Sequence, residues 1–247
     1  MKNKFRLRKS SIISIIASIL ILIIFNILFY DKMPAELPTH WNFQGQADDY
    51  SSKFDAMVLT HGFLVVMNIF ACFMLDNDPR NKRQNNFVMT ISKLAMPAIM
   101  LVVYTITVMV GLGRDVNVSV IIPLFVGLLF IAIGNYLPKT RRNYTMGIKL
   151  PWTLNSDENW RRTHRLGGIC FIGIGLSLII SIFFKSEVIF FAALIIGGLI
   201  PGFYSCLLYT SDAADEGLGG LGDVYKRQVH FYLATWVNYK GVGVGVL

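Results

Sequence analysis

Six apolar runs, each about the length of one membrane crossing, constrain the fold of this 247-residue chain more than any other feature. They cover residues 12–29, 56–75, 94–112, 118–137, 168–184 and 188–204. A helix needs about 20 residues to cross the hydrocarbon core of a membrane. Because backbone groups without hydrogen bonds are costly in lipid, each run is expected to be a helix. Only 15% of the residues are charged, well below the usual fraction in soluble domains. We therefore predict an all-α integral membrane protein with six transmembrane helices.

The first run has some features of a signal peptide, because basic residues precede it at Lys2, Lys4, Arg6, Arg8 and Lys9. Its apolar core is longer than the roughly 7–15 residues typical of signal peptides, and no small-x-small cleavage site follows it. We therefore predict that it is retained as the first span.

The distribution of Lys and Arg between the runs predicts the orientation of the chain. Five precede the first run, and the connections that follow carry two, four, one, seven and one. Because cytoplasmic connections are enriched in Lys and Arg, this alternation predicts that the N-terminus and the C-terminus are cytoplasmic. Residues 31–55 are then extracellular and residues 138–167 cytoplasmic. The net charge of +8 follows this orientation, so we expect no nucleic acid partner.

The predicted extracellular loop, residues 31–55, is acidic and contains turn-forming residues. Pro38 disfavours helix in the residue before it, and Gly45 permits a turn. His40 and acidic neighbours such as Asp48 could suggest a metal site. One His without further ligands at a recognised spacing is weak support, so we predict no metal and no cofactor. The candidate ligand contacts in this loop are Pro38, His40, Asn42, Gly45, Asp48 and Lys53.

The predicted cytoplasmic loop, residues 138–167, contains a second helix signal. Asn155 is a good N-cap, and Glu158 three residues later gives a variant of the capping box. Acidic residues at the start and arginines at the end match the helix dipole. Trp160 and His164 share one face. These features predict one cytoplasmic interfacial helix between spans four and five, which ends where two glycines turn the chain into the fifth span.

The polar residues within the runs are few. Asp and Glu are absent from the interiors of all six, which argues against a proton-coupled pump. His61, Asn68 and Asn135 are expected inside the bundle, where hydrogen bonding between helices is their ordinary role. No HExxH or GxSxG pattern and no paired span carboxylates occur, so we predict that the chain is not an enzyme. The cysteines imply no disulfide framework.

The character of the chain changes after residue 205. The peptide CLLYTS at residues 206–211 can be encoded by TGT CTC TTA TAC ACA TCT. The reverse complement of this DNA, read one base in and completed by one base, encodes DVYKRQ, which is found at residues 223–228. The DNA also resembles a transposon-end sequencing adapter. We predict that residues 206–247 are a translated sequencing-adapter artefact and form no domain; the alternative is a natural Gly-rich tail.

Two motifs resemble those of a known family. Residues 38–53, PTHWNFQGQADDYSSK, resemble a loop with a Pro-x-His-aromatic-Asn pattern that belongs to a bacterial membrane domain. Residues 134–168 resemble the second half of the SdpI family of multi-pass membrane proteins. The resemblance implies an N-terminal membrane domain over residues 1–112 and an SdpI-like membrane domain over residues 113–205. The candidate motif positions of the cytoplasmic loop are Asn135, Pro138, Asn143, Gly147, Pro151, Trp152, Trp160, His164 and Gly167.

The resemblance implies a multi-pass protein of the bacterial cytoplasmic membrane that gives immunity to a secreted antimicrobial peptide. Signalling through a cytoplasmic repressor is a further expectation from the resemblance. The expected partners are therefore the lipid bilayer, a peptide toxin outside and a repressor inside. A small-molecule transporter or channel is the alternative function. A membrane enzyme that uses His164 with Asp157 or Glu158 is a third alternative.

Overall fold

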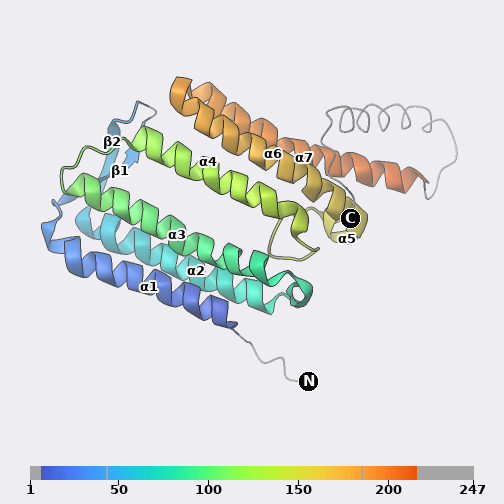
Figure 1. Cartoon of the computed structure of the whole chain (residues 1–247), viewed down its shortest axis with the longest axis horizontal. Helices are drawn as coiled ribbons and strands as arrows, with labels where there is room; N and C mark the ends of the chain where they lie inside the picture. The colour runs from blue at the N-terminus through green and yellow to red at the C-terminus, as the bar shows by residue number, and fades with distance from the viewer. Residues whose placement is uncertain (1–6, 43, 185, 216–247) are drawn as a thin grey trace.

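Six long helices dominate the computed structural model, which describes residues 7–42, 44–184 and 186–215. They are α1 (Lys9–Phe29), α2 (Thr60–Asn77), α3 (Asn86–Gly111), α4 (Val118–Tyr136), α6 (Asp157–Phe184) and α7 (Glu187–Asp215) (Figure 1). Within the described residues, six helical segments are long and apolar enough to cross a membrane. The number of predicted spans is therefore confirmed.

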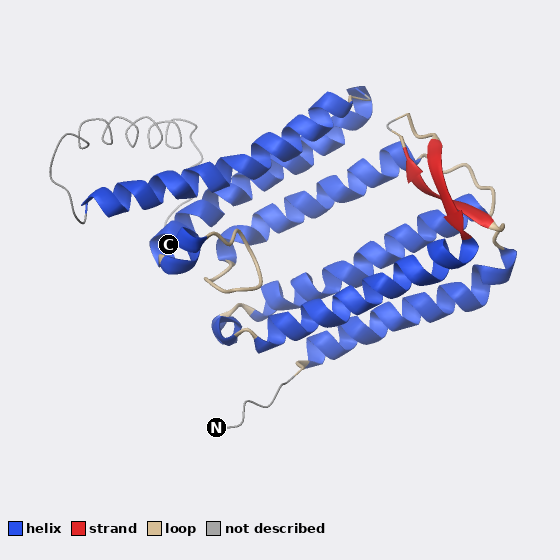
Figure 2. Ribbon diagram, turned by 180° about the vertical axis from the view of Figure 1, so that it is seen from behind, coloured by secondary structure: helices blue, strands red, loops and turns tan. Residues whose placement is uncertain are grey.

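The helices form two groups that lie side by side (Figures 1 and 2). Helices α1, α2 and α3 pack on one another, and α6 packs on both α4 and α7. We call the end of the molecule with the two strands the hairpin end. The opposite end, with the start of α1, the α2–α3 connection and residues 140–156, is the loop end. This arrangement brings connections from both groups together at each end.

Helix α1 buries polar rather than apolar residues. Its buried residues are Ser11, Ser14 and Ser18, which share one helix face. Apolar residues such as Ile13, 60% exposed, cover its outer surface. An apolar exterior around a small, polar interior is the pattern expected of a helix whose outer surface contacts lipid.

Helices α4 and α6 approach closely at two glycine pairs. A Cβ on Gly134 would lie 2.7 Å from the carbonyl oxygen of Gly168, and a Cβ on Gly127 would lie 2.8 Å from that of Gly175. The pairs recur about two helical turns apart. Helices in membranes associate through such small residues, so these glycines fix the α4–α6 interface.

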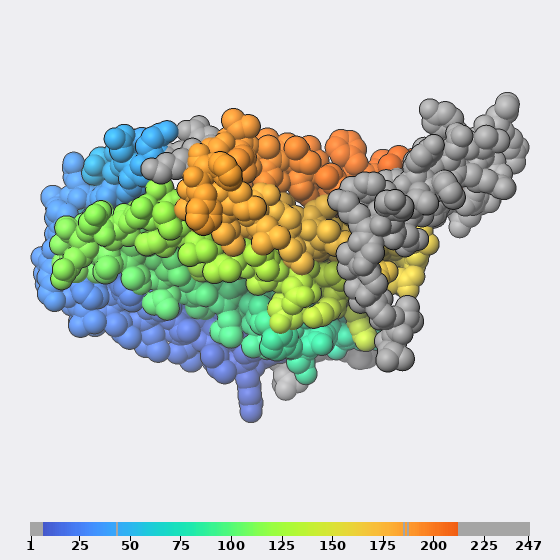
Figure 3. All heavy atoms as spheres, turned by 45° about the horizontal axis from the view of Figure 1, so that its top comes forward, coloured from blue at the N-terminus to red at the C-terminus, as the bar shows by residue number. Residues whose placement is uncertain are grey.

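The chain also contains an antiparallel β-hairpin, so the prediction of an all-α fold was incomplete. Strand β1 (Glu36–Trp41) pairs with β2 (Ala47–Ser52) within the predicted extracellular loop. The hairpin is stable at this place because Leu37 is fully buried and, with Met33, packs where Gly111 of α3 leaves no side chain. The space-filling view shows the hairpin, the start of α4 and the end of α6 gathered at one end (Figure 3).

Short elements connect the long helices. They are the 3-10 turns η1 (Tyr30–Lys32), η3 (Pro79–Arg83) and η4 (Leu137–Lys139), the π-helical segment η2 (Asp55–Leu59) and the short helix α5 (Pro151–Asn155).

The predicted interfacial helix is not separate from the fifth span. Helix α6 runs without interruption from Asp157 to Phe184, and Ser156, not Asn155, accepts the first-turn hydrogen bond, from the amide of Asn159 at 3.1 Å. Gly167 and Gly168 do not form a turn. Their missing side chains instead leave room for Ile148 and for the α4 backbone, so their role is close packing.

The predicted adapter segment lies mostly outside the described residues. Residues 206–215 continue α7 as helix, and residues 216–247 are not described. The prediction about this segment concerns the origin of its DNA and stays a prediction.

Candidate functional site

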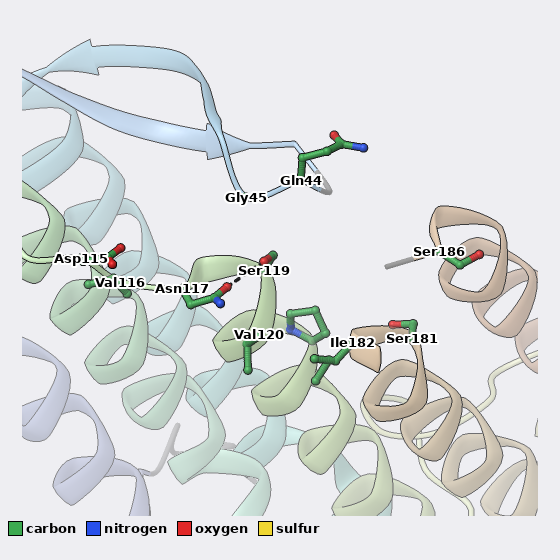
Figure 4. A pocket seen from close by; sticks show the side chains of 11 residues that line it. Gln44, Gly45, Asp115, Val116, Asn117, Ser119, Val120, Ser181, Ile182 and Ser186 are labelled. Atoms are coloured by element: carbon green, nitrogen blue, oxygen red, sulfur yellow. Dashed lines mark hydrogen bonds between the residues drawn. The ribbon is translucent and has the colours of Figure 1, made fainter. Parts of the chain in front are cut away.

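A cavity of about 350 Å³ lies at the hairpin end, between the hairpin tip, the start of α4 and the end of α6. Its lining comes from the hairpin tip at Gln44 and Gly45, from residues 115–117 and the first turns of α4, and from the end of α6 with Ser186 beyond it. In Figure 4, the tip lies above Ser119, and Ser186 lies on the side of the cavity opposite Asp115. Residues far apart in the sequence therefore form one site.

A tight turn holds the hairpin tip over α4. The side chain of Asn42 accepts a hydrogen bond from the amide of Gln46 at 2.9 Å, and the amide of Gly45 donates to the carbonyl of Asn42 at 2.9 Å. Gly45 has φ +80°, a conformation that favours glycine. A Cβ at this position would also lie 3.1 Å from Oγ of Ser119. Asn42 therefore shapes the turn, and Gly45 lets it approach the helix.

The other candidate residues of the hairpin do not line the cavity. His40 pairs with Asp48, with Nδ1 2.6 Å from the carboxylate, and both are exposed. Pro38 lies opposite Tyr50 in the hairpin register. The ammonium group of Lys53 lies 4.6 Å from the centre of the Tyr30 ring. The sequence grouped these residues into one contact set, whereas the structure spreads them along the hairpin.

At the loop end, Asn143 organises the tight turn that begins the motif. Its buried side-chain oxygen accepts hydrogen bonds from the amides of Thr145 at 2.9 Å and Met146 at 2.6 Å, while its Nδ2 donates to the carbonyl of Arg141 at 2.8 Å. Gly147 follows with φ +95°. One asparagine thus satisfies the backbone groups of a turn that has no regular secondary structure.

His164 is a structural residue of this loop. Its Nε2 accepts a hydrogen bond from the amide of Ile148 at 3.0 Å, so Nδ1 donates to the carbonyl of Trp160 at 2.8 Å. The His164 ring stacks on Trp160, whose indole N–H donates to Thr140. A Cβ on Gly147 would overlap Nε2. Both ring nitrogens are therefore hydrogen-bonded to backbone groups, and His164 holds the loop at Ile148 against α6.

The remaining motif residues join elements to one another. Pro151 is the first residue of α5, and Trp152 donates its indole N–H to Oγ of Ser205 in α7 at 2.7 Å. Pro138 packs against Gly168, and Gly167 leaves room for Leu137 and Ile148.

The prediction for Asn135 was wrong. It was expected inside the bundle, but it is exposed on α4, because the neighbouring Gly134 is the residue that faces α6.

The α2–α3 connection holds the motif loop, residues 140–150, in place through hydrogen bonds. Nothing in the sequence indicated this contact, which we call the clamp. Asp78 accepts hydrogen bonds from the amide of Tyr144 at 2.7 Å and from Oγ1 of Thr145 at 3.1 Å. Asn81 donates to the same Thr145 oxygen at 2.7 Å, and Gln84 bonds the backbone of Arg141 in both directions. Polar residues in a helix connection give no sign of their partners, so this contact could not be predicted.

A buried ion pair between α2 and α3 was also missed. Nζ of Lys93 lies 2.5 Å from Oδ1 of Asp76, and both side chains are fully buried. Lys93 had been counted as a loop charge, but it lies inside α3 because Asp76 neutralises it there. The other carboxylate oxygen accepts from Oγ of Ser11 at 2.6 Å and from the amide of Arg8 at 2.7 Å. The serines on one face of α1 were the sequence signal that could have predicted a polar interior between α1, α2 and α3.

Asn68 and His61 lie in the bundle as predicted. Nδ2 of Asn68 donates to Oγ of Ser18 at 2.7 Å and to Ser14, which confirms bonding between helices. His61 is buried, stacks on Tyr104 with ring centres 3.5 Å apart, and bonds the carbonyl of Ala56. These contacts continue the polar interior of α1–α3 from the ion pair toward the hairpin end.

Comparisons with known proteins match both helix groups. Residues 139–205 match the SdpI/YfhL protein family, and residues 17–64 match a domain of unknown function, DUF1648. Immunity protein SdpI of Bacillus subtilis (strain 168) is 25% identical over 181 residues, which cover 73% of this chain and 85% of that protein. No solved structure matches the chain. The SdpI/YfhL match ends at residue 205, just before the predicted adapter segment.

Proposed function

Because this chain is a multi-pass bacterial membrane protein of the SdpI family, we propose that it gives its cell immunity to a secreted antimicrobial peptide. The proposal rests above all on the relationship to an immunity protein, which extends over most of both chains. A membrane protein can give such immunity by binding the peptide before it damages the bilayer. We propose that this binding is the protective step and that no catalysis is involved.

The orientation that we propose follows the charges of the connections. The hairpin end is outside, where Asp48, Asp49 and Asp115 are exposed. The loop end is inside, where it carries most of the Lys and Arg residues of the connections. Cytoplasmic enrichment of basic residues supports this choice.

A secreted peptide would then meet the hairpin and the cavity beneath its tip. The cavity is the feature best suited to binding, because it is concave and is lined by polar side chains such as Asn117 and Ser119. The helices α4 and α6, in contact through their glycine pairs, connect this cavity with the motif loop at the other end. Binding outside can therefore change the position of α6 and of the loop that His164 holds.

We propose signalling to a cytoplasmic repressor as the finer function of the loop end. The motif residues Asn143 and His164 are buried, so they would shape the docking surface without touching the partner. The exposed residues of the same region, Tyr144, Arg161 and Arg165, would contact it. The cationic character of the two arginines favours an acidic surface on the partner.

The direct test is expression of the full chain in a peptide-sensitive bacterial strain, followed by survival curves with several candidate secreted peptides. We expect a rise in the lethal concentration of at least one peptide. The matched control is Gly168→Leu, which disrupts the α4–α6 interface and should remove protection. A chain that reaches the membrane in full amount but protects against none of the peptides would refute immunity.

A small-molecule transporter is the second candidate, and the polar interior of α1–α3 is the observation that favours it. Asn68, Ser14 and Ser18 form a hydrogen-bonded line within the bundle. Uptake into proteoliposomes that disappears with Asn68→Leu would favour transport. Protection without measurable flux would favour immunity by binding.

A further inference from the structure

The cavity at the hairpin end exposes hydrogen-bond acceptors. Pro123 in α4 lines the cavity and has no N–H, so the carbonyl of Ser119 lacks the hydrogen bond that residue 123 of a regular helix would donate. The hydroxyl of Ser119 donates to the side-chain oxygen of Asn117 at 2.8 Å (Figure 4). That hydroxyl is therefore already used as a donor, and its own oxygen remains free to accept.

Among the described residues, the cavity lining contains one charged side chain, and it is acidic. Asp115 contributes the one carboxylate of its lining, and no basic side chain of a described residue lines it. The opposite wall is the last turn of α6, at Ser181 and Ile182, where the helix dipole gives partial negative charge. The start of α4 carries the opposite partial charge, which Asp115 offsets.

The cavity also has an apolar wall, from Val116, Val120 and Ile182. A long cationic side chain matches this combination, because its methylene stem packs on apolar surface while its charged head seeks acceptors. Ammonium and guanidinium groups are pure donors and need the oxygens that this cavity offers. An anionic group would leave those acceptors unpaired, and a neutral donor would not neutralise the carboxylate of Asp115.

We propose that this cavity binds a lysine or arginine side chain of the secreted peptide, with its cationic head held by Asp115 and the Ser119 carbonyl. The inference rests on the proposed immunity function, because it names the chemistry of the peptide that is bound. It also separates two roles of the acidic hairpin end. Carboxylates on the hairpin, such as Asp49, attract a cationic peptide over a distance of about one Debye length, roughly 8 Å in physiological salt. Asp115 holds one side chain of that peptide in place.

The test uses the full chain in nanodiscs of phosphatidylcholine, which carry no net charge, and dansylcadaverine as a fluorescent primary amine. Its N-acetylated form is the neutral control. We expect the amine to bind and the acetylated form not to bind. Asp115→Asn should weaken binding about tenfold, the loss that one charge-assisted hydrogen bond gives. Pro123→Ala should weaken it about threefold, because the restored N–H occupies the Ser119 carbonyl.

The matched control is Asp49→Asn, which removes an exposed carboxylate of the hairpin outside the cavity lining. It should leave binding unchanged at physiological salt. Equal losses for Asp115→Asn and Asp49→Asn would refute the inference, because they would show attraction by the whole charged surface. Displacement of the amine by an equimolar amount of Ca²⁺ would overturn it as well, because the cavity would then be a metal site.

Survival assays separate this inference from the proposed function. If the wild-type chain protects cells and Asp115→Asn protects them equally, the cavity inference fails and immunity stands. If dansylcadaverine binds through Asp115 but no secreted peptide is resisted, the amine site stands and immunity fails. Protection that falls with Asp115→Asn and not with Asp49→Asn supports both.

Discussion

The ion pair between Asp76 and Lys93 gives the sharpest prediction about stability. Both side chains are fully buried, and 2.5 Å separates Nζ from Oδ1. Removal of one partner leaves a charge in a low-dielectric interior, which typically costs about 3–5 kcal/mol. The two halves of the pair are not equivalent, because their remaining partners differ.

Asp76→Asn should be the more destabilising substitution. Without the carboxylate, the ammonium group of Lys93 retains the hydroxyl of Ser10 at 3.1 Å as its polar contact. We expect a loss near the upper end of the range, about 4–5 kcal/mol. In Lys93→Met, the carboxylate keeps the hydroxyl of Ser11, the amide of Arg8 and the Arg8 guanidinium at 3.7 Å. That loss should therefore be smaller, about 2–3 kcal/mol.

A double-mutant cycle measures the coupling between the two charges. Reversible unfolding in mixed dodecylmaltoside–SDS micelles, followed by far-UV circular dichroism, gives the free energy for each variant. Asp76→Asn/Lys93→Met should be more stable than the sum of the single effects predicts, by at least about 2 kcal/mol, because no unpaired charge remains. Additive effects within about 0.5 kcal/mol would show that the two side chains do not interact, and the reasoning would be wrong.

Three further predictions concern packing and the clamp. Gly168→Ala should lower the free energy of unfolding by roughly 1–3 kcal/mol because its Cβ would meet the α4 backbone, whereas Gly173→Ala, with open space around it, should change it little. Thermal unfolding in detergent compares the two, and equal melting temperatures would contradict the close approach. Gly147→Ala should lower the free energy of unfolding by about 2 kcal/mol in the same assay, because φ is +95° and the new Cβ would displace His164. An unchanged melting temperature would show that the loop adapts. Asp78→Ala should speed tryptic cleavage within residues 140–156, because the amide of Tyr144 loses its acceptor; an unchanged cleavage rate, measured by mass spectrometry, would argue against the clamp.

The sequence was sufficient for the six spans and the family motifs, but it misplaced several residues. Hydropathy located all six long helices because crossing a membrane is a property of one segment alone, but α3 and α6 begin well before the predicted runs, at Asn86 and Asp157. His164 was correctly singled out by the motif, yet its partners, Ile148 and Trp160, depend on a turn that Asn143 builds. Asn135 was placed inside the bundle because no sequence signal fixes how α4 is rotated about its axis. The hairpin was missed because residues 31–55 show no clear alternation of apolar and polar side chains.

By itself, the sequence determined that this protein is a membrane bundle of six helices and that it has the motifs of the SdpI family. These properties depend on residues that are contiguous in the sequence, so they can be predicted without knowing which distant residues they contact. Only the tertiary structure decided which residues meet: Asp76 with Lys93, Gly134 with Gly168, and the hairpin tip with the start of α4. Such contacts depend on the rotation and register of helices that are distant in sequence. A shift of one residue turns a helical side chain by about 100° and would break each of them.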